Sequence, residues 1–442
     1  TDPEMGDLLK RLSDDGGLDA DQRALVRETQ YDYDRATKLP AEFVERFAEE
    51  QSRAFQAWMK AREARDYGLF VDNLRNMVDF SKQQAEYLGY EGSRYNALLE
   101  EYERGMTAET LRPIFGELAE KQSALVERIM AAPNQPDVTW SEREWDTDAQ
   151  WAFTLEVLED ISYDFEAGRQ DKSVHPFTTT FDLYDVRVTT RVHPEELFSA
   201  LTGTIHEGGH ALYEQGFRPE DQRTLLAAAP SLGMHESQSR MWENVIGRSL
   251  QFWKHYAPKI RKHYPGQLDR VEPHDFFHAI NQVQPSFIRV EADECTYNLH
   301  IILRFEIEVD LIEDKLTVHD VPEVWNAKVK QYLGLDVPDD AMGCLQDVHW
   351  SHGSMGYFPT YALGNLYAAQ LFEKIEADVP DLWQCVEGGN FSSLLSWLRA
   401  HVHQIGRRMT APELVEAATG RKPDSAAYLR YLEKKYGALY GL

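Results

Sequence analysis

Two histidines four residues apart, with a glutamate directly after the first, make TIHEGGHALYEQG the segment of this chain best suited to chemistry. Residues four apart lie on one face of an α-helix, so His206 and His210 can bind one metal ion. Glu207 lies one step round the helix, where it can act as general base on a water held by that ion. The alternative is a chance match in an ordinary helix. The adjacent Gly208 and Gly209 argue against it, because each glycine costs a helix about 1 kcal/mol relative to alanine. We expect them to leave space beside the metal for substrate or a neighbouring helix.

A catalytic zinc ion needs a third protein ligand and one open position. The next predicted helix, 231–250, contains the pair His235 and Glu236. Glu236 fits the combination of two histidines and one carboxylate better, and His235 is the competing candidate. The alternative interpretation of Glu236 is an ordinary charged side chain on a solvated face of the helix.

Arg289 and Asp293 flank an apolar stripe in the segment 285–316, which we expect to be helical. One interpretation is a helical ion pair between residues four apart, worth a few tenths of a kcal/mol. The functional interpretation is a guanidinium held in place to bind a carboxylate through two hydrogen bonds.

The segment 343–364, GCLQDVHWSHGSMGYFPTYALG, mixes polar and aromatic side chains with glycines. A core segment would avoid so many polar groups, so we interpret it as a wall of the active site. His and Tyr side chains are suitable donors to an oxyanion that develops during a reaction. The candidates are His349, His352, Tyr357 and Tyr361.

One stretch, PFTTTFDLYDVRVTTRV, lacks a helical period and predicts a β-hairpin with strands Phe177–Phe181 and Val186–Val192. Alternation along the second strand places Asp185, Arg187 and Thr189 on one face. The simpler interpretation is a hairpin with its polar face in solvent. The functional interpretation is an edge strand that presents backbone groups to an extended peptide.

Most of the remaining chain predicts helices, with apolar residues three or four apart. The clearest are 41–65, 70–88, 107–131 and 148–168, and the helix of the metal motif is expected to run from Pro194 to Gly216. Neither an internal repeat nor a low-complexity linker divides the chain. The expected fold class is therefore mainly α, with a small β-hairpin.

Composition excludes several classes of function. The 442 residues contain 43% hydrophobic residues, enough for a large core, and carry a net charge of −28. That charge argues against a nucleic-acid partner, because phosphates would be repelled. No run of roughly 18 apolar residues predicts a membrane span. Three scattered cysteines make a disulfide framework unexpected and favour a reducing cytoplasm.

Five segments follow one another between residues 185 and 350: DVRVT, HEGGH, HESQ, IRVEAD and GCLQDVHW. Together they resemble the motifs of the carboxypeptidase Taq family of thermostable metallocarboxypeptidases. Those motifs are D-x-R-x-T, H-E-x-x-H, H-E-[ST]-Q, I-R-x-x-A-D and G-x-x-Q-D-x-H-W. Five motifs in one order are highly specific, and HPFT and GYFPTY are also similar to segments of that family.

The resemblance implies a single elongated helical domain with a deep groove, similar to neurolysin and angiotensin-converting enzyme. Residues 1–170 would form a helical groove wall, 171–365 the catalytic part with the motifs, and 366–442 the C-terminal helices. It also implies a Zn²⁺ or Co²⁺ ion, a homodimer, and release of C-terminal residues from peptides with broad specificity.

Carried over residue by residue, the resemblance makes His206, His210 and Glu236 the metal ligands and Glu207 the general base. Arg289 would bind the terminal carboxylate of the substrate. Asp185, Arg187 and Thr189 would lie on the edge strand of the groove, and His349, His352, Tyr357 and Tyr361 would contact the transition state.

The chain departs from the family at its beginning. Members usually start with helices that contain a W-D-Q…M-P-P-type segment, whereas the first tryptophan here is Trp58. The comparison with the family therefore predicts a member shortened at the N-terminus, and leaves open how the groove is walled and which peptide lengths fit.

Two rival functions stay open at this point. The same metal set serves endopeptidases or dipeptidases, and a shortened N-terminus could open the groove for them. A non-catalytic peptide-binding protein with a structural metal is disfavoured, because structural zinc sites are usually closed and rich in cysteine.

Overall fold

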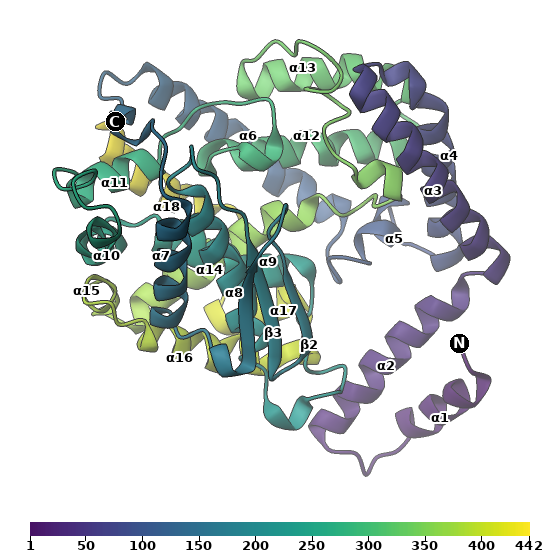
Figure 1. Ribbon diagram of the computed structural model, residues 1–442. Helices are drawn as coiled ribbons and strands as arrows, with labels where there is room; N and C mark the ends of the chain where they lie inside the picture. Colours follow the sequence, from purple (N-terminus) through teal and green to yellow (C-terminus); the bar gives the residue numbers. More distant parts are fainter. The chain divides into compact units, whose positions relative to one another are not determined.

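The computed structural model describes all 442 residues and is mainly helical, with one sheet of three strands (Figure 1). The predicted fold class, mainly α with a small sheet, is confirmed. The chain forms two compact units. The first consists of residues 1–130 and 283–362, and the second of residues 131–282 and 363–442.

The core of the first unit is built around α12 (Glu294–Ile312), in which almost every residue is buried. This helix contacts α4, α5 and α13. Its apolar side chains surround the helix on all sides, as expected of a helix at the centre of a large core. The other helices of this unit are α1 (Pro3–Ser13), α2 (Ala20–Lys38), α3 (Ala41–Ala64), α4 (Val71–Leu88), α5 (Tyr95–Leu99), α6 (Ala108–Ala131) and α13 (Val321–Leu333).

In the second unit, α8 (Ser199–Glu214) lies beside α7 (Thr147–Asp160), α9 (Leu232–Arg240) and the strands β2 (Thr178–Asp182) and β3 (Asp185–Thr190) (Figure 1). It is therefore covered by helices on one side and by the sheet on another. The remaining elements are β1 (Gly168–Lys172), α10 (Leu250–His263), α11 (Pro273–Ile280), α14 (Pro359–Asp378), α15 (Leu382–Glu387), α16 (Ser392–His401), α17 (Ala411–Thr419) and α18 (Ala426–Tyr440).

Three of the predicted helices, 41–65, 70–88 and 107–131, match α3, α4 and α6 to within a residue at each end. The prediction for 148–168 was wrong at its C-terminal end, because α7 ends at Asp160. The chain turns at Ser162, which has a φ of 74°, and continues into β1. Parallel pairing of β1 with β3 overrides the weak strand preference of its sequence, GRQDK.

The predicted hairpin is present as the antiparallel pair β2 and β3, but its second strand does not lie at an edge. The strand order is β1-β3-β2, so β3 has a hydrogen-bonded neighbour on both sides. The prediction of an edge strand carrying Asp185, Arg187 and Thr189 was therefore wrong. The error has one cause: β1 was not recognised as a strand.

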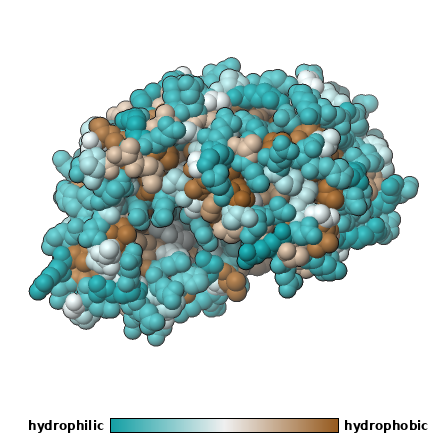
Figure 2. Space-filling view, turned by 90° about the horizontal axis from the view of Figure 1, so that it is seen from above, coloured by the Kyte–Doolittle hydropathy of each residue, from teal (hydrophilic) through white to brown (hydrophobic).

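Most residues on the face seen in Figure 2 are hydrophilic, and the hydrophobic ones form small separate groups. This agrees with the net charge of −28. None of the helices combines the length and the apolar character needed to span a membrane.

Candidate active site

Both histidines of the metal motif lie on α8, but this helix begins later than predicted. It starts at Ser199, not at Pro194. The backbone carbonyl of Pro194 accepts a hydrogen bond from the backbone N–H of Trp145, and that of His193 accepts one from the side chain of Gln150. These contacts hold His193 and Pro194 against α7 and the segment before it, and the carbonyl of His193 also accepts from the backbone N–H of Glu196 in a turn that precedes the helix.

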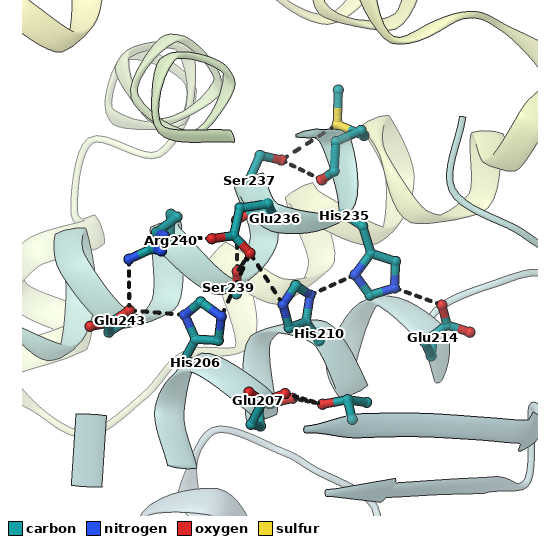
Figure 3. A network of polar contacts seen from close by, with 12 residues as sticks. His206, Glu207, His210, Glu214, His235, Glu236, Ser237, Ser239, Arg240 and Glu243 are labelled. Atoms are coloured by element: carbon teal, nitrogen blue, oxygen red, sulfur yellow. Dashed lines mark hydrogen bonds and ion pairs between the residues drawn. The ribbon is translucent and has the colours of Figure 1, made fainter. Parts of the chain in front are cut away.

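His206 and His210 project from α8 toward Glu236 on α9 (Figure 3). One carboxylate oxygen of Glu236, Oε2, lies 3.6 Å from Nε2 of His206 and 3.4 Å from Nε2 of His210. The three residues each offer one ligand atom, and all these atoms lie within 4.8 Å of one another. Tetrahedral zinc sites with bonds of about 2.0–2.1 Å have ligand atoms about 3.3–3.5 Å apart. The donor set and its spacing therefore fit a divalent cation.

The structure separates the two candidates for the third ligand. His235 contacts Nδ1 of His210, on the side of the ring opposite to Glu236. Only Glu236 shares a cluster with the Nε2 atoms of both histidines. The α9 helix that carries it is capped by Ser231, whose hydroxyl accepts from the backbone N–H of Met234.

The predicted helix 231–250 is three elements. After α9 the backbone widens into a π-helix, Met241–Gly247, and α10 starts after a new cap at Ser249. π-Helical turns are rare and are often found at functional sites. Here the π-helix carries Glu243, which sequence reasoning missed.

Charged side chains contact His206 and Glu236 from outside the cluster (Figure 3). Oε2 of Glu243 lies 2.9 Å from Nδ1 of His206, and Nε of Arg240 donates to Oε1 of Glu236 over 2.6 Å. Arg240 thereby occupies one oxygen of Glu236 and leaves Oε2 to the histidines. Arg248 pairs with the other oxygen of Glu243 at 2.6 Å. The only feature of the sequence that could have predicted the contact between Arg240 and Glu236 is their spacing of four residues.

These contacts decide the charges of the cluster. Burial opposes ionisation of Glu236, but Arg240 and the imidazoles outweigh it and hold the pKa of this carboxyl well below its ordinary range. The pKa of Glu243 is lowered in the same way, against burial, by Arg248 and His206. Burial alone would lower the pKa of His206, but Glu236 and Glu243 outweigh it and raise that pKa. Both glutamates are therefore anionic at neutral pH.

Glu207 points away from the two histidines, toward the sheet (Figure 3). Its side chain is nearly buried, and Oε2 accepts a hydrogen bond from the hydroxyl of Thr178 on β2 over 2.7 Å. The role of Thr178 was also missed, although it directly follows the segment HPF. The hydrogen bond fixes one oxygen of the Glu207 carboxylate.

The two glycines of the motif lie where neighbouring helices approach α8. A methyl group on Gly209 would stand 2.7 Å from the backbone Cα of Ser239 on α9. A methyl group on Gly208 would stand 2.8 Å from Cδ2 of Leu158, the end of a flexible side chain on α7. The expectation that the glycines admit a neighbouring helix is thus confirmed, most clearly for Gly209.

A second polar cluster lies in the first unit, around Arg289. The prediction that 285–316 is one helix was wrong, because α12 begins at Glu294. Asp293 is its N-cap and accepts from the backbone N–H groups of Cys295 and Thr296, so it is not the partner of Arg289.

Arg289 is held by Asp347 of the motif GCLQDVHW. Its Nε and Nη2 donate to Oδ1 of Asp347 over 2.9 and 2.8 Å, and Nη1 donates to the hydroxyl of Tyr297 over 3.1 Å. The buried Arg304 donates to Oδ2 of the same carboxylate over 2.7 Å. Burial opposes the charge of Asp347, but the two guanidinium groups outweigh it and keep the pKa of this carboxyl far below its usual value. Two cations share one anion here.

The four predicted aromatic donors do not all lie together. His349 and Tyr361 approach to 3.3 Å between Nε2 and the hydroxyl, and Tyr357 packs against both rings. Burial lowers the pKa of His349 to about 4, so its ring is neutral at pH 7. His352 is exposed and contacts the ring of Phe55 on α3.

Comparisons with known proteins place the chain in one family. The sequence model of the carboxypeptidase Taq (M32) metallopeptidases matches residues 1–436. Thermostable carboxypeptidase 1 of Thermus thermophilus is 42% identical over 100% of this chain and 89% of its own length. Carboxypeptidase 1 of Bacillus subtilis is 40% identical over 99% of this chain and 87% of its own.

Solved structures agree with the sequences. The M32 carboxypeptidase from Deinococcus radiodurans R1 superimposes with a TM-score of 0.98, at 42% identity over 100% of this chain and 89% of that one. The carboxypeptidase of Pyrococcus furiosus gives a TM-score of 0.95 at 35% identity, over 98% of this chain and 88% of that one. The family expected from the five sequence segments is confirmed: the chain belongs to the carboxypeptidase Taq (M32) metallopeptidases and is a metallocarboxypeptidase.

Proposed function

We propose that the protein is a zinc-dependent carboxypeptidase that releases C-terminal residues from peptides, with His206, His210 and Glu236 as the metal ligands. The observation that carries this proposal is the convergence of both Nε2 atoms on one oxygen of Glu236. A divalent cation held there acts as a Lewis acid and makes a water molecule acidic enough to attack at neutral pH. Two histidines and one carboxylate are a ligand set of catalytic zinc, and Co²⁺ is the alternative ion.

Glu207 serves as the general base and later as the general acid. Its carboxylate follows the ligand His206 in the helix and is not used as a ligand. We infer that it takes a proton from the attacking water and passes it to the leaving amine. The hydrogen bond from Thr178 to Oε2 leaves Oε1 for this proton.

Arg289 binds the terminal carboxylate of the substrate. It uses three N–H groups on Asp347 and Tyr297, and a guanidinium has five. One N–H group on Nη1 and one on Nη2 are left by these hydrogen bonds, and two guanidinium N–H groups can match the two oxygens of a carboxylate. The cluster of Arg289, Arg304 and Asp347 carries one net positive charge, which favours an anion. Neutral His349 and the hydroxyls of Tyr357 and Tyr361 supply further donors. His352, which is exposed and packs on Phe55, is not assigned a contact with the transition state.

An extended peptide pairs with β2, which lies at the edge of the sheet. The sequence had predicted β3 for this role. The backbone N–H of Thr189 donates to the carbonyl of Phe177 over 2.9 Å. With this register, the backbone groups of Thr178 and Thr180 point away from β3, toward the outer side of β2. Asp185, Arg187 and Thr189 then support the substrate through β2, since Arg187 stacks on Phe181 and the hydroxyl of Thr189 accepts from the N–H of Phe177.

We also propose broad side-chain specificity, a homodimeric state, and action in the cytoplasm by one catalytic domain of 442 residues. All three cysteines are free thiols, a state that a reducing compartment maintains. The resemblance to the carboxypeptidase Taq family supports the dimer and the broad specificity.

One peptide prepared with a free and with an amidated C-terminus tests recognition of the chain end. We expect kcat/KM for the amide to be at least a hundredfold lower, and Arg289→Leu to remove this difference. An endopeptidase would cleave both forms at the same rate, and that result would exclude carboxylate anchoring.

A further inference from the structure

A chain of three side chains runs outward from the metal cluster on the side away from Glu236 (Figure 3). Nδ1 of His210 lies 2.5 Å from Nδ1 of His235, and Nε2 of His235 lies 2.7 Å from Oε1 of Glu214. His210 and Glu214 belong to α8 and His235 to α9. The chain therefore ties the helix of the metal motif to the next helix.

The order of protons along this chain is fixed by its two ends. Nε2 of His210 faces Glu236 and must keep a free lone pair if it binds a metal ion, so its Nδ1 carries the proton. A carboxylate accepts hydrogen bonds only, so Nε2 of His235 carries a proton for Glu214. Nδ1 of His235 is then an acceptor. With Nε2 of His210 on a metal ion and Glu214 ionised, each of the two contacts then has one donor and one acceptor.

The two histidine ligands are thus supported in different ways. His206 meets the carboxylate of Glu243 directly, whereas His210 reaches Glu214 through a second imidazole. Packing fixes the interposed ring, because its centroid lies 4.6 Å from that of His210 and 5.3 Å from that of Tyr213.

Glu214, at the outer end, lines a cavity of about 180 Å³ beside β2, together with Thr180 and Phe217. Contact with this cavity leaves the carboxylate partly hydrated, so its charge is not isolated in an apolar interior.

We propose that His235 and Glu214 are positioning residues that hold the ring of His210 with Nε2 directed at the metal and thereby set the affinity for the metal. This inference rests on the proposed metal site. Partners of this kind orient ligand imidazoles in many metal sites, and their loss typically costs 10–100-fold in affinity.

Two substitutions of His235 separate the acceptor from the bulk of the ring. His235→Phe keeps an aromatic ring against Tyr213 but has no acceptor. His235→Asn places its side-chain oxygen where Nδ1 stood and keeps the acceptor for His210. The dissociation constants for Zn²⁺ and Co²⁺, measured against a competing chelator, should rise 10–100-fold in His235→Phe. In His235→Asn they should stay within about fivefold of wild type, since the hydrogen bond to His210 remains.

Glu214→Leu extends the test to the outer end, and Glu220→Leu, an exposed acid beyond the same helix, is its matched control. We expect weaker metal binding in the first and wild-type affinity in the second. Thermal unfolding of the metal-free proteins identifies variants that lose affinity only because they unfold.

Nuclear magnetic resonance of the wild-type protein with ¹⁵N-labelled histidine needs no variant. The ring of His235, assigned by its absence from the His235→Asn spectrum, should carry its proton on Nε2. A proton on Nδ1, or equal affinities in His235→Phe and wild type, would overturn the positioning role while the metal site stands. A wild-type protein that binds no metal, or binds it unchanged after His206→Ala, would overturn the proposed function and this inference together.

Discussion

The hydroxyl of Thr178 donates to Oε2 of Glu207 over 2.7 Å and lies 3.0 Å from the backbone carbonyl of the same residue. This one hydroxyl thus lies against both the side chain and the backbone of the proposed general base, and its single hydrogen holds the side chain. A carboxylate with one oxygen engaged has a defined direction for its other oxygen. Through Thr178, the small sheet of this helical protein holds the side chain of Glu207 in one direction.

Replacing Thr178 by valine keeps the shape of the side chain and removes the donor. We expect kcat to fall about tenfold, with KM little changed, because a hydrogen bond to a charged group contributes about 1.5–3 kcal/mol. Thr178→Ser retains the hydroxyl and should keep most of the activity. Steady-state kinetics of the three proteins provide the measurement, and an unchanged kcat in Thr178→Val would contradict the role.

Gly208 and Gly209 should differ in their response to alanine. An added methyl at Gly209 meets the backbone of α9, which cannot move alone, so Gly209→Ala should destabilise by about 1–3 kcal/mol. At Gly208 the obstacle is the end of the Leu158 side chain, and the gain in helix propensity of about 1 kcal/mol offsets its displacement. Urea unfolding of the two variants tests this order, and an equal loss in both would contradict it.

The sequence predicted that His206, His210 and Glu236 lie together, because most of the information for this cluster is local. A helix brings His206 and His210 together, and the pair HE at 235–236 limited the candidates for the third member of the cluster to two residues. Whether His235 or Glu236 joins the two histidines depends on the direction in which α9 crosses α8. Packing between the two helices sets this direction, including their close approach at Gly209.

Other features of the structure were not predictable from the sequence, since they depend on contacts between residues that are distant in the chain. Arg289 has an acidic residue four positions later, which suggested a helical pair, yet its actual partner is Asp347. Likewise, β1 becomes a strand only because β3 is available to pair with it. Glu308 is one of several acids in RFEIEVDLIED, and nothing in that pattern marks it as buried.

Glu308 gives a prediction for pH. Its carboxylate accepts from Tyr95, Trp350 and the backbone N–H of Gly356, yet burial dominates and raises its pKa from 4.5 to about 7. The folded protein therefore binds this proton more tightly than the unfolded chain does. The stabilisation is complete below about pH 4.5 and is lost as the pH rises through about 7, a change of about 3 kcal/mol.

Glu308→Gln imitates the protonated form at every pH. The difference in unfolding free energy, wild type minus variant, should fall by about 3 kcal/mol between pH 4.5 and pH 8. Denaturant titrations at a series of pH values provide these free energies. A difference that stays constant over this range would show that Glu308 does not titrate there.

Metal binding and peptide hydrolysis measured together on Glu207→Gln test the central claim most directly. This variant should bind one Zn²⁺ per chain with an affinity close to that of wild type, because Glu207 is not among the ligands. Its release of C-terminal residues should fall by roughly 10²–10⁴, the contribution of a general base. His206→Ala, as the reference, should lose both metal and activity. Substantial hydrolysis by metal-loaded Glu207→Gln would contradict the assignment of the base, and full activity of His206→Ala would contradict the site itself.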